Sequence, residues 1–303
     1  MRKLVVALAA PVLVVAALAG CGSSSSSSSS SGATTSAGPV TTPAINTSIA
    51  KLVPAAIKSK GTLAVATEAQ YAPNEFIAPD GHTVIGMDAD LMHTIASLMG
   101  LKVKLINSDF ESIIPGLAAG RYDLGVSSFT DTKEREKTVD FVTYFQAGIT
   151  FYAKSSSTAV IGKVGDLCGK TVALEKGTTE QEEATKQSST CTKEGKKAVN
   201  VLSFPGQNPV NLAVASGRAE VGMADSPVAE YQVKQSAGKF KLLCKCYGFA
   251  PYGIAIPKKS GMTAPILAAV KQVISDGTYA AILKRWGVES GAITEPKIDG
   301  AIS

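Results

Sequence analysis

Residues 125–137 read GVSSFTDTKEREK, and the interpretation of the whole fold depends on this stretch. A strand is predicted over residues 122–126, so Ser127, Ser128 and Thr130 would follow its carboxyl end. Open α/β sheets bind their ligands at the carboxyl ends of the strands. The hydroxyls and backbone amides of this stretch are therefore expected to contact a ligand.

Arg135 comes next, in a short helix that is expected to start near Asp131. Its planar guanidinium can bind a carboxylate through two parallel hydrogen bonds. A serine or threonine that caps a helix, followed by a solvated arginine, would give the same pattern. The other strand ends are needed to separate these two interpretations.

Predicted strands and helices alternate along the chain from Thr62 to Trp286. This alternation indicates an α/β fold with largely parallel sheets. If the strands share sheets, the residues at their carboxyl ends converge on a cleft for a small molecule. Polar or aromatic residues follow five predicted strands, namely Glu68, Phe110, the run from Ser127 to Thr130, Thr178 and Asp225.

The chemistry of these residues describes an α-amino acid. Arg135 and the serine and threonine groups supply a carboxylate site, and Asp225 supplies a site for an ammonium group. Glu68 would favour a ligand side chain that donates hydrogen bonds, such as that of Lys, Arg, His or Gln, unless it is a solvated turn residue. Three aromatic residues would either pack the apolar stem of the ligand or belong to the core, namely Tyr71, Phe110 and Phe129.

Residues 1–20 are predicted to be a secretory signal, with a basic start and then an apolar run that is short for a membrane span. The run ends in LAGC, and Cys21 is the expected site of lipidation. Residues 21–49 include nine consecutive serines and are expected to form a disordered tether. The sequence thus predicts a protein anchored by lipid to the extracellular face of the membrane.

Removal of residues 1–20 would leave 28 basic and 25 acidic residues, and a formal charge of +3 is too small to indicate nucleic acid. No phosphate-binding loop or metal cluster is evident in the sequence. The two histidines, His82 and His93, lack ligand spacing from a pair of cysteines. We therefore expect no nucleic-acid partner, no metal and no cofactor.

Four cysteines follow Cys21, an even number that favours disulfides in an exported protein. Three pairings are possible. We favour Cys168 with Cys191, because these two residues flank one predicted strand and helix. Cys244 and Cys246 would then be a strained local pair or two free thiols.

Seven segments resemble family 3 of the solute-binding proteins, the polar amino acid receptors of ABC importers. Their order and spacing carry the resemblance from Gly61 to Gly287, and the segments are TLAVATEAQYAPNEF, VIGMDADLMHTIASLMG, FESIIPGLAAGRYDLGVSSFTDTKEREKTVDF, GKTVALEKGTT, AEVGMADSPVAEY, APYGIAIPK and ISDGTYAAILKRWG.

The resemblance implies a periplasmic-binding-protein-like fold, in which two α/β lobes are joined by two extended crossovers. The crossovers would fall near 146–150 and 248–252. Lobe one would be discontinuous, with residues 50–149 and 249–294, and lobe two would contain residues 150–248. Residues 295–303 would form a C-terminal tail.

The resemblance also implies roles for individual residues. Arg135 matches the arginine that binds the α-carboxylate, with help from Thr130 and from Thr178 or Thr179. Asp225 matches the acid that holds the α-ammonium group. Ser128 matches a residue whose carbonyl also accepts a hydrogen bond from the α-ammonium group. Glu68 matches an acidic position that contacts and selects the ligand side chain in receptors for basic amino acids.

Two features depart from the family pattern. Asn74 stands where the family often has an aromatic residue, so the side-chain selectivity of relatives does not transfer directly. Cys244 and Cys246 also lie outside the usual pattern.

The implied function is that of a lipid-anchored, monomeric extracellular receptor, not an enzyme, which captures a polar or basic α-amino acid and delivers it to an ABC permease. Two alternatives use the same cleft. One is an enzyme similar to cyclohexadienyl dehydratases, for which Glu68 would be the general acid. The other is a lipoprotein that senses amino acids and reports through a partner.

Overall fold

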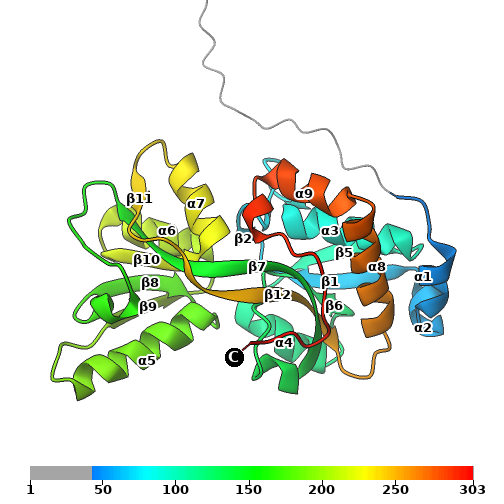
Figure 1. Ribbon diagram of the computed structural model, residues 1–303, viewed down its shortest axis with the longest axis horizontal. Coiled ribbons are helices and arrows are strands. Elements are labelled where there is room, and N and C mark those ends of the chain that lie inside the picture. Colours follow the sequence, from blue (N-terminus) through cyan, green and yellow to red (C-terminus); the bar gives the residue numbers. More distant parts are fainter. Residues whose placement is uncertain (1–42, 303) are drawn as a thin grey trace, which may run out of the picture. The chain divides into compact units, whose positions relative to one another are not determined.

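The computed structural model describes residues 43–302 of the 303-residue chain. The predicted signal segment 1–20, the lipidation site Cys21 and most of the predicted tether lie outside the described residues. The described part is an α/β fold with two lobes, which confirms the predicted fold class, and two long strands run between the lobes (Figure 1).

One mixed sheet runs through both lobes in the order β5-β1-β6-β12-β7-β10-β8-β9, and β11 pairs with β7. The pairings among β5, β1 and β6 are parallel, and so are those among β10, β8 and β9. The bounds are β1 (Thr62–Thr67), β5 (Lys102–Asn107), β6 (Leu124–Gly125), β7 (Val139–Lys154), β8 (Thr171–Glu175), β9 (Asn200–Phe204), β10 (Val221–Asp225), β11 (Phe240–Leu242) and β12 (Tyr247–Pro257).

The middle of the sheet is antiparallel, whereas the sequence predicted largely parallel sheets. β7 and β12 pair with each other in opposite directions from Tyr247↔Ile149 to Pro257↔Val139, with two irregularities in register. The chain crosses from the first lobe to the second along β7 and returns along β12, so the two crossovers must run antiparallel (Figure 1).

A small antiparallel sheet lies apart from the main sheet and consists of β2 (Gln70–Tyr71), β3 (Glu75–Ile77) and β4 (Val84–Ile85). The α-helices are α1 (Thr47–Leu52), α2 (Ala55–Lys60), α3 (Met87–Leu98), α4 (Phe110–Ala118), α5 (Thr179–Lys193), α6 (Gln207–Ser216), α7 (Ser226–Gln235), α8 (Thr263–Ser275) and α9 (Thr278–Trp286). Residues 43–302 also contain three short 3-10 helices, η1 (Arg135–Lys137), η2 (Val164–Leu167) and η3 (Glu289–Gly291).

Each lobe has its own hydrophobic core, as expected for two separately packed units. In the first lobe, α3, α8 and α9 cover the sheet, and Leu63, Ile95 and Ile266 are fully buried between them. In the second lobe, the core residues include Phe151 and Leu174. The two lobes are therefore packed as separate units.

The folded part begins before residue 50, so the predicted end of the tether at residue 49 is several residues too late. The side chain of Asn46 accepts hydrogen bonds from the backbone amides of Ser48 and Ile49, which makes it the N-cap of α1. Ile49 is buried against the first-lobe core. A cap and one buried apolar residue are enough to order this short helix against the domain.

The starts of two helices place residues near the pocket. α3 begins at Met87 with Gly86 as its N-cap, and Asp88, its second residue, turns its carboxylate inward. Phe110 is the first residue of α4. Pro115 lacks an N–H group but is accommodated within this helix.

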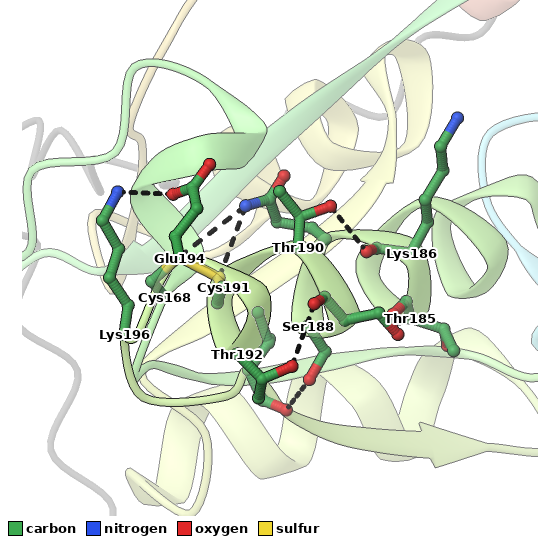
Figure 2. Close-up of a disulfide and its surroundings, with 12 residues drawn as sticks. Cys168, Thr185, Lys186, Ser188, Thr190, Cys191, Thr192, Glu194 and Lys196 are labelled. Atoms are coloured by element: carbon green, nitrogen blue, oxygen red, sulfur yellow. Dashed lines mark hydrogen bonds and ion pairs between the residues drawn. A yellow bond between two sulfur atoms is a disulfide. The ribbon is translucent and has the colours of Figure 1, made fainter.

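The predicted disulfide between Cys168 and Cys191 is confirmed, and Figure 2 shows it joining helix α5 to the residue that follows η2. The amide nitrogen of Gln187, one turn before Cys191 on α5, lies 3.3 Å from the sulfur of Cys191. Cys244 and Cys246 are free thiols in the structure and are half-buried.

No single helix among residues 43–302 is long and apolar enough to cross a membrane, and α8 and α9 reach that length only as a pair bent by 78°.

We expect the double variant Cys168→Ala/Cys191→Ala to lower the free energy of unfolding by about 3 kcal/mol, because the bridge closes a loop of 23 residues in the unfolded chain. Urea unfolding of the variant and of the reduced wild type would measure this loss. Cys244→Ala is the matched control and should retain wild-type stability to within about 1 kcal/mol. An unchanged unfolding midpoint in the double variant would contradict a structural role for the bridge.

Candidate functional site

One pocket lies between the two lobes, and every predicted ligand residue except Phe129 lines it. Phe129 is buried and stacks on Phe110 with ring centroids 4.7 Å apart, which places it behind the pocket wall. The space inside is close to what one water molecule needs. An amino acid can therefore enter only if side chains from the two lobes move apart.

The serines of the sequence GVSSFTDTKEREK are held by two buried acids that sequence reasoning missed. The hydroxyl of Ser127 donates to Glu75 Oε1 at 3.2 Å, and that of Ser128 donates to Glu75 Oε2 at 3.2 Å. The backbone N–H of Ser128 donates to Asp88 Oδ2 at 3.0 Å. Ser128 has a φ of +49°, which residues other than glycine seldom adopt. The hydrogen bonds to Glu75 and Asp88 therefore hold an unusual backbone conformation in place.

Glu68 follows β1 and is buried, not solvated. Its backbone N–H donates to the hydroxyl of Ser127 at 2.9 Å, so the two strand ends are tied together. Its carboxyl approaches the second lobe, because a Cβ added at Gly206 would come within 2.9 Å of Glu68 Oε1. Burial raises the pKa of Glu68 to about 7, while a hydrogen bond from the backbone of Gln70 opposes the shift.

Arg135 reaches from the first lobe to the second. Its guanidinium donates to the carbonyl of Thr130 at 2.8 Å and to the carbonyl of Gly177, in the second lobe, at 3.0 Å. The guanidinium also lies over the rings of Phe110 and Phe129, 5.4 and 5.8 Å from their centroids. Aromatic rings and carbonyls fix the plane of the group, and a guanidinium held in this way has further N–H donors that can bind a carboxylate.

Asp225 ends β10 and meets a tyrosine from the other lobe. The hydroxyl of Tyr71 donates to Asp225 Oδ2 at 3.1 Å, and the backbone N–H of Asp225 donates to the same hydroxyl at 3.1 Å. Burial, and next the charge of Glu180, raise the pKa of Asp225 well above its usual value. The hydroxyl of Tyr71 thus joins Asp225 of the second lobe to the first lobe.

The second lobe adds two more carboxyls, that of Glu175 at the end of β8 and that of Glu180 in the first turn of α5. Thr178 is the N-cap of this helix, and its hydroxyl donates to the carbonyl of Glu175 at 2.7 Å. The hydroxyl of Thr179 donates to Glu180 Oε2 at 3.2 Å. Glu175 Oε2 and Glu180 Oε1 are buried and have no hydrogen-bond partner among the described residues. Two carboxyl oxygens that face a pocket without a donor make it suited to a cationic or donor-rich ligand.

The charges that line the pocket are unbalanced. Of the described lining residues, Arg135 has a basic side chain, whereas five have carboxyl groups, namely Glu68, Glu75, Glu175, Glu180 and Asp225. Burial is the first cause that raises the pKa of each of the five. Their mutual repulsion adds to this, since Glu68 raises the pKa of Glu175 across the lobes and Asp88 raises that of Glu75.

The signals for the missed residues differ in strength. Glu175 is the last residue of a predicted strand, so the same strand-end rule that selected Asp225 would have found it. Glu180 lies in the first turn of a helix, where acidic residues are common for reasons unrelated to a ligand. Glu75 and Asp88 lie in no pattern that distinguishes them from solvated residues. No three His, Cys, Asp or Glu side chains in residues 43–302 are arranged to hold a metal ion.

Comparison with known proteins assigns the family. The sequence profile of the bacterial extracellular solute-binding proteins, family 3, matches residues 63–289. The chain belongs to this family. This solute-binding protein is 33% identical over 252 residues to the arginine-binding protein ArgT of Corynebacterium glutamicum, a match that covers 83% of the chain and 82% of the relative.

Solved structures of related proteins share the two-lobed fold. An ancestral arginine-binding protein bound to glutamine has a TM-score of 0.69 and 33% identity, covering 76% of this chain and 99% of that chain. The ancestral amino acid-binding protein AncCDT-1, a precursor of cyclohexadienyl dehydratase, has a TM-score of 0.68 and 31% identity, covering 76% and 97%.

The raised pKa values predict how stability depends on pH. Glu68 has a pKa of about 7 and Asp88 of about 6, so between about pH 4 and pH 7 the folded protein holds protons that the unfolded chain has lost. The free energy of unfolding, measured with urea and no added ligand, should therefore fall as the pH rises from about 5 to about 8.

Glu68→Gln is the matched control for this pH dependence, because an amide cannot lose the proton, and its slope should be shallower than that of the wild type. A wild-type stability that rises with pH over the same range would contradict the assignment of protonated carboxyls to the pocket.

Proposed function

We propose that this solute-binding protein captures an α-amino acid with a cationic side chain between its two lobes and delivers it to an ABC import permease. The observation that carries the proposal is the charge of the pocket, where five buried carboxyl groups face one arginine. A ligand with one carboxylate and two cationic groups complements this arrangement.

The geometry supports one orientation of the ligand. The α-carboxylate binds Arg135 and the hydroxyls of Thr130 and Thr179, since all three residues line the pocket and carry hydrogen-bond donors. The α-ammonium group takes the place of the Tyr71 hydroxyl at Asp225, because an ammonium donates three hydrogen bonds and neutralises the carboxylate. Both contacts require groups from the two lobes to close on the same ligand.

The side chain of the ligand then lies between Glu68 of the first lobe and Glu175 of the second. These two acids are close enough for Glu68 to raise the pKa of Glu175. A guanidinium or ammonium group placed between them replaces repulsion by two charge-assisted hydrogen bonds, each worth roughly 1.5–3 kcal/mol. Arginine fits this proposal best, because its planar group can donate to both carboxylates at once.

The same charges weigh against an enzyme that acts on cyclohexadienyl acids. Such a substrate carries a second carboxylate, which would lie among carboxyl groups with no second basic residue lining the described pocket. Glu68 has a pKa suited to a general acid at neutral pH, and this favours the enzyme as the second candidate. A sensor of amino acids would use the same pocket and differ only in its partner.

Transport is the cellular role that we propose for the captured ligand. Lipidation at Cys21 and the serine-rich segment that follows would hold a monomeric receptor near its permease on the extracellular face of the membrane, which raises its effective concentration there.

Ligand selectivity tests the proposed function directly. We expect L-arginine to bind at least about tenfold more tightly than L-citrulline, its neutral analogue of similar shape, in isothermal titration calorimetry at neutral pH. Glu175→Gln should weaken the binding of arginine by about tenfold or more and change that of citrulline little, because only the cation interacts with the carboxylate charge.

Arg135→Ala and Asp225→Ala are the companion variants and should abolish the binding of every amino acid, while Lys133→Ala, at an exposed neighbour of the site, should not. Equal affinities for arginine and citrulline would contradict the proposed selectivity for a cationic side chain. Binding of prephenate-like acids with turnover, and no binding of amino acids, would favour the enzyme instead.

The lipid anchor has a separate test. Metabolic labelling with a fatty acid should mark the wild-type protein and not the Cys21→Ala variant, which lacks the thiol that would be acylated. Equal labelling of the two proteins would contradict lipidation at this residue.

A further inference from the structure

The C-terminal residues 297–301 lie against β7 of the first lobe, beyond residue 289, where the family match ends. The backbone N–H of Thr143 donates to the carbonyl of Lys297 at 2.9 Å, and that of Asp299 donates to the carbonyl of Phe141 at 3.0 Å. The carboxylate of Asp299 accepts from the N–H of Phe141 at 2.8 Å. This segment is thus an ordered part of the lobe and not a free tail.

The last residues of the segment end on two acids of the loop 130–137. The backbone N–H of Gly300 donates to Asp131 Oδ2 at 2.7 Å, and the N–H of Ala301 donates to Glu136 Oε1 at 3.2 Å. Asp131 is only 1% exposed, so the N–H of Gly300 replaces water as its donor. This loop contains Arg135.

Asp131 connects residues 297–301 to the crossover strand β12 and to the loop that contains Arg135. Its backbone N–H donates to the carbonyl of Pro251, in the crossover strand β12, at 2.8 Å. The residue before it, Thr130, accepts from the guanidinium of Arg135 at 2.8 Å. Hydrogen bonds, together with the peptide bond between Thr130 and Asp131, therefore connect residues 297–301 to the crossover strand β12 and to Arg135.

We propose that residues 297–301 are a positioning element of the amino acid site, which holds the loop 130–137 through Asp131 and Glu136 and thereby fixes Arg135 for the ligand carboxylate. This inference rests on the proposed function of Arg135. It predicts that loss of the segment weakens ligand binding through the loop, and not merely through the stability of the lobe.

The test compares four variants of the otherwise complete chain. They are a truncation after Pro296, Asp131→Ala, Asp131→Asn, which keeps an acceptor for the N–H of Gly300, and Ile302→Ala, at a side chain that is 72% exposed. Calorimetry with L-arginine gives Kd, thermal unfolding gives stability, and amide hydrogen exchange without ligand gives the protection of residues 131–138.

We expect the truncation and Asp131→Ala each to raise Kd about tenfold, the cost of losing about one well-formed buried hydrogen bond at the site. Exchange should quicken in residues 131–138 before it changes elsewhere in the lobe. Asp131→Asn and Ile302→Ala should keep Kd within about twofold of the wild type.

An unchanged Kd in both the truncation and Asp131→Ala would overturn the proposal, as would exchange that quickens uniformly across the lobe. If the wild type binds no amino acid, the proposed function fails. The exchange comparison still decides the role of the segment, because faster exchange confined to residues 131–138 supports it and unchanged exchange there refutes it.

Discussion

Six carboxyl groups are buried in or behind one pocket, and the cost of ionising them together constrains the whole site: Glu68, Glu75, Asp88, Glu175, Glu180 and Asp225. Two like charges about 4 Å apart repel by roughly 4 kcal/mol at the effective dielectric constant of a protein. With one arginine nearby, most of these groups can be buried only if they keep a proton or gain a cationic partner. The cationic ligand that we propose would remove this repulsion.

These groups are divided between the two lobes. Glu68 and Arg135 belong to the first lobe, whereas Glu175 and Asp225 belong to the second. In the proposed function, an approach of the lobes brings carboxyl groups closer to one another, and a cation placed between them would offset that repulsion. The hydrogen bond from Tyr71 to Asp225 and that from Arg135 to Gly177 show which contacts already join the lobes. A ligand with differential affinity for the closed arrangement would shift the protein toward it.

The fold class and several residues that line the pocket could be predicted from the sequence. Alternating strands and helices predicted the α/β fold, and the resemblance to the family implied its two lobes. Residues at strand ends, among them Ser128 and Asp225, were predicted to lie together, and they line the pocket with Arg135. Periodicity could not predict the antiparallel middle of the sheet, because it reports which residues are buried and not the direction of the neighbouring strand. Nor could it reveal Asp88, whose carboxylate lies inside the lobe only because the backbone of Ser128 and the hydroxyl of Tyr144 donate to it.

Proton release on ligand binding tests the central claim most directly. Calorimetric titration with L-arginine at about pH 7, repeated in buffers with different ionisation enthalpies, gives the number of protons exchanged. A cation that binds between raised-pKa carboxyls stabilises their ionised forms, so the protein should release protons to the buffer. Uptake of protons, or a binding enthalpy that is the same in every buffer, would contradict the claim that the pocket carboxyls are protonated without ligand and lose protons when a cationic amino acid binds.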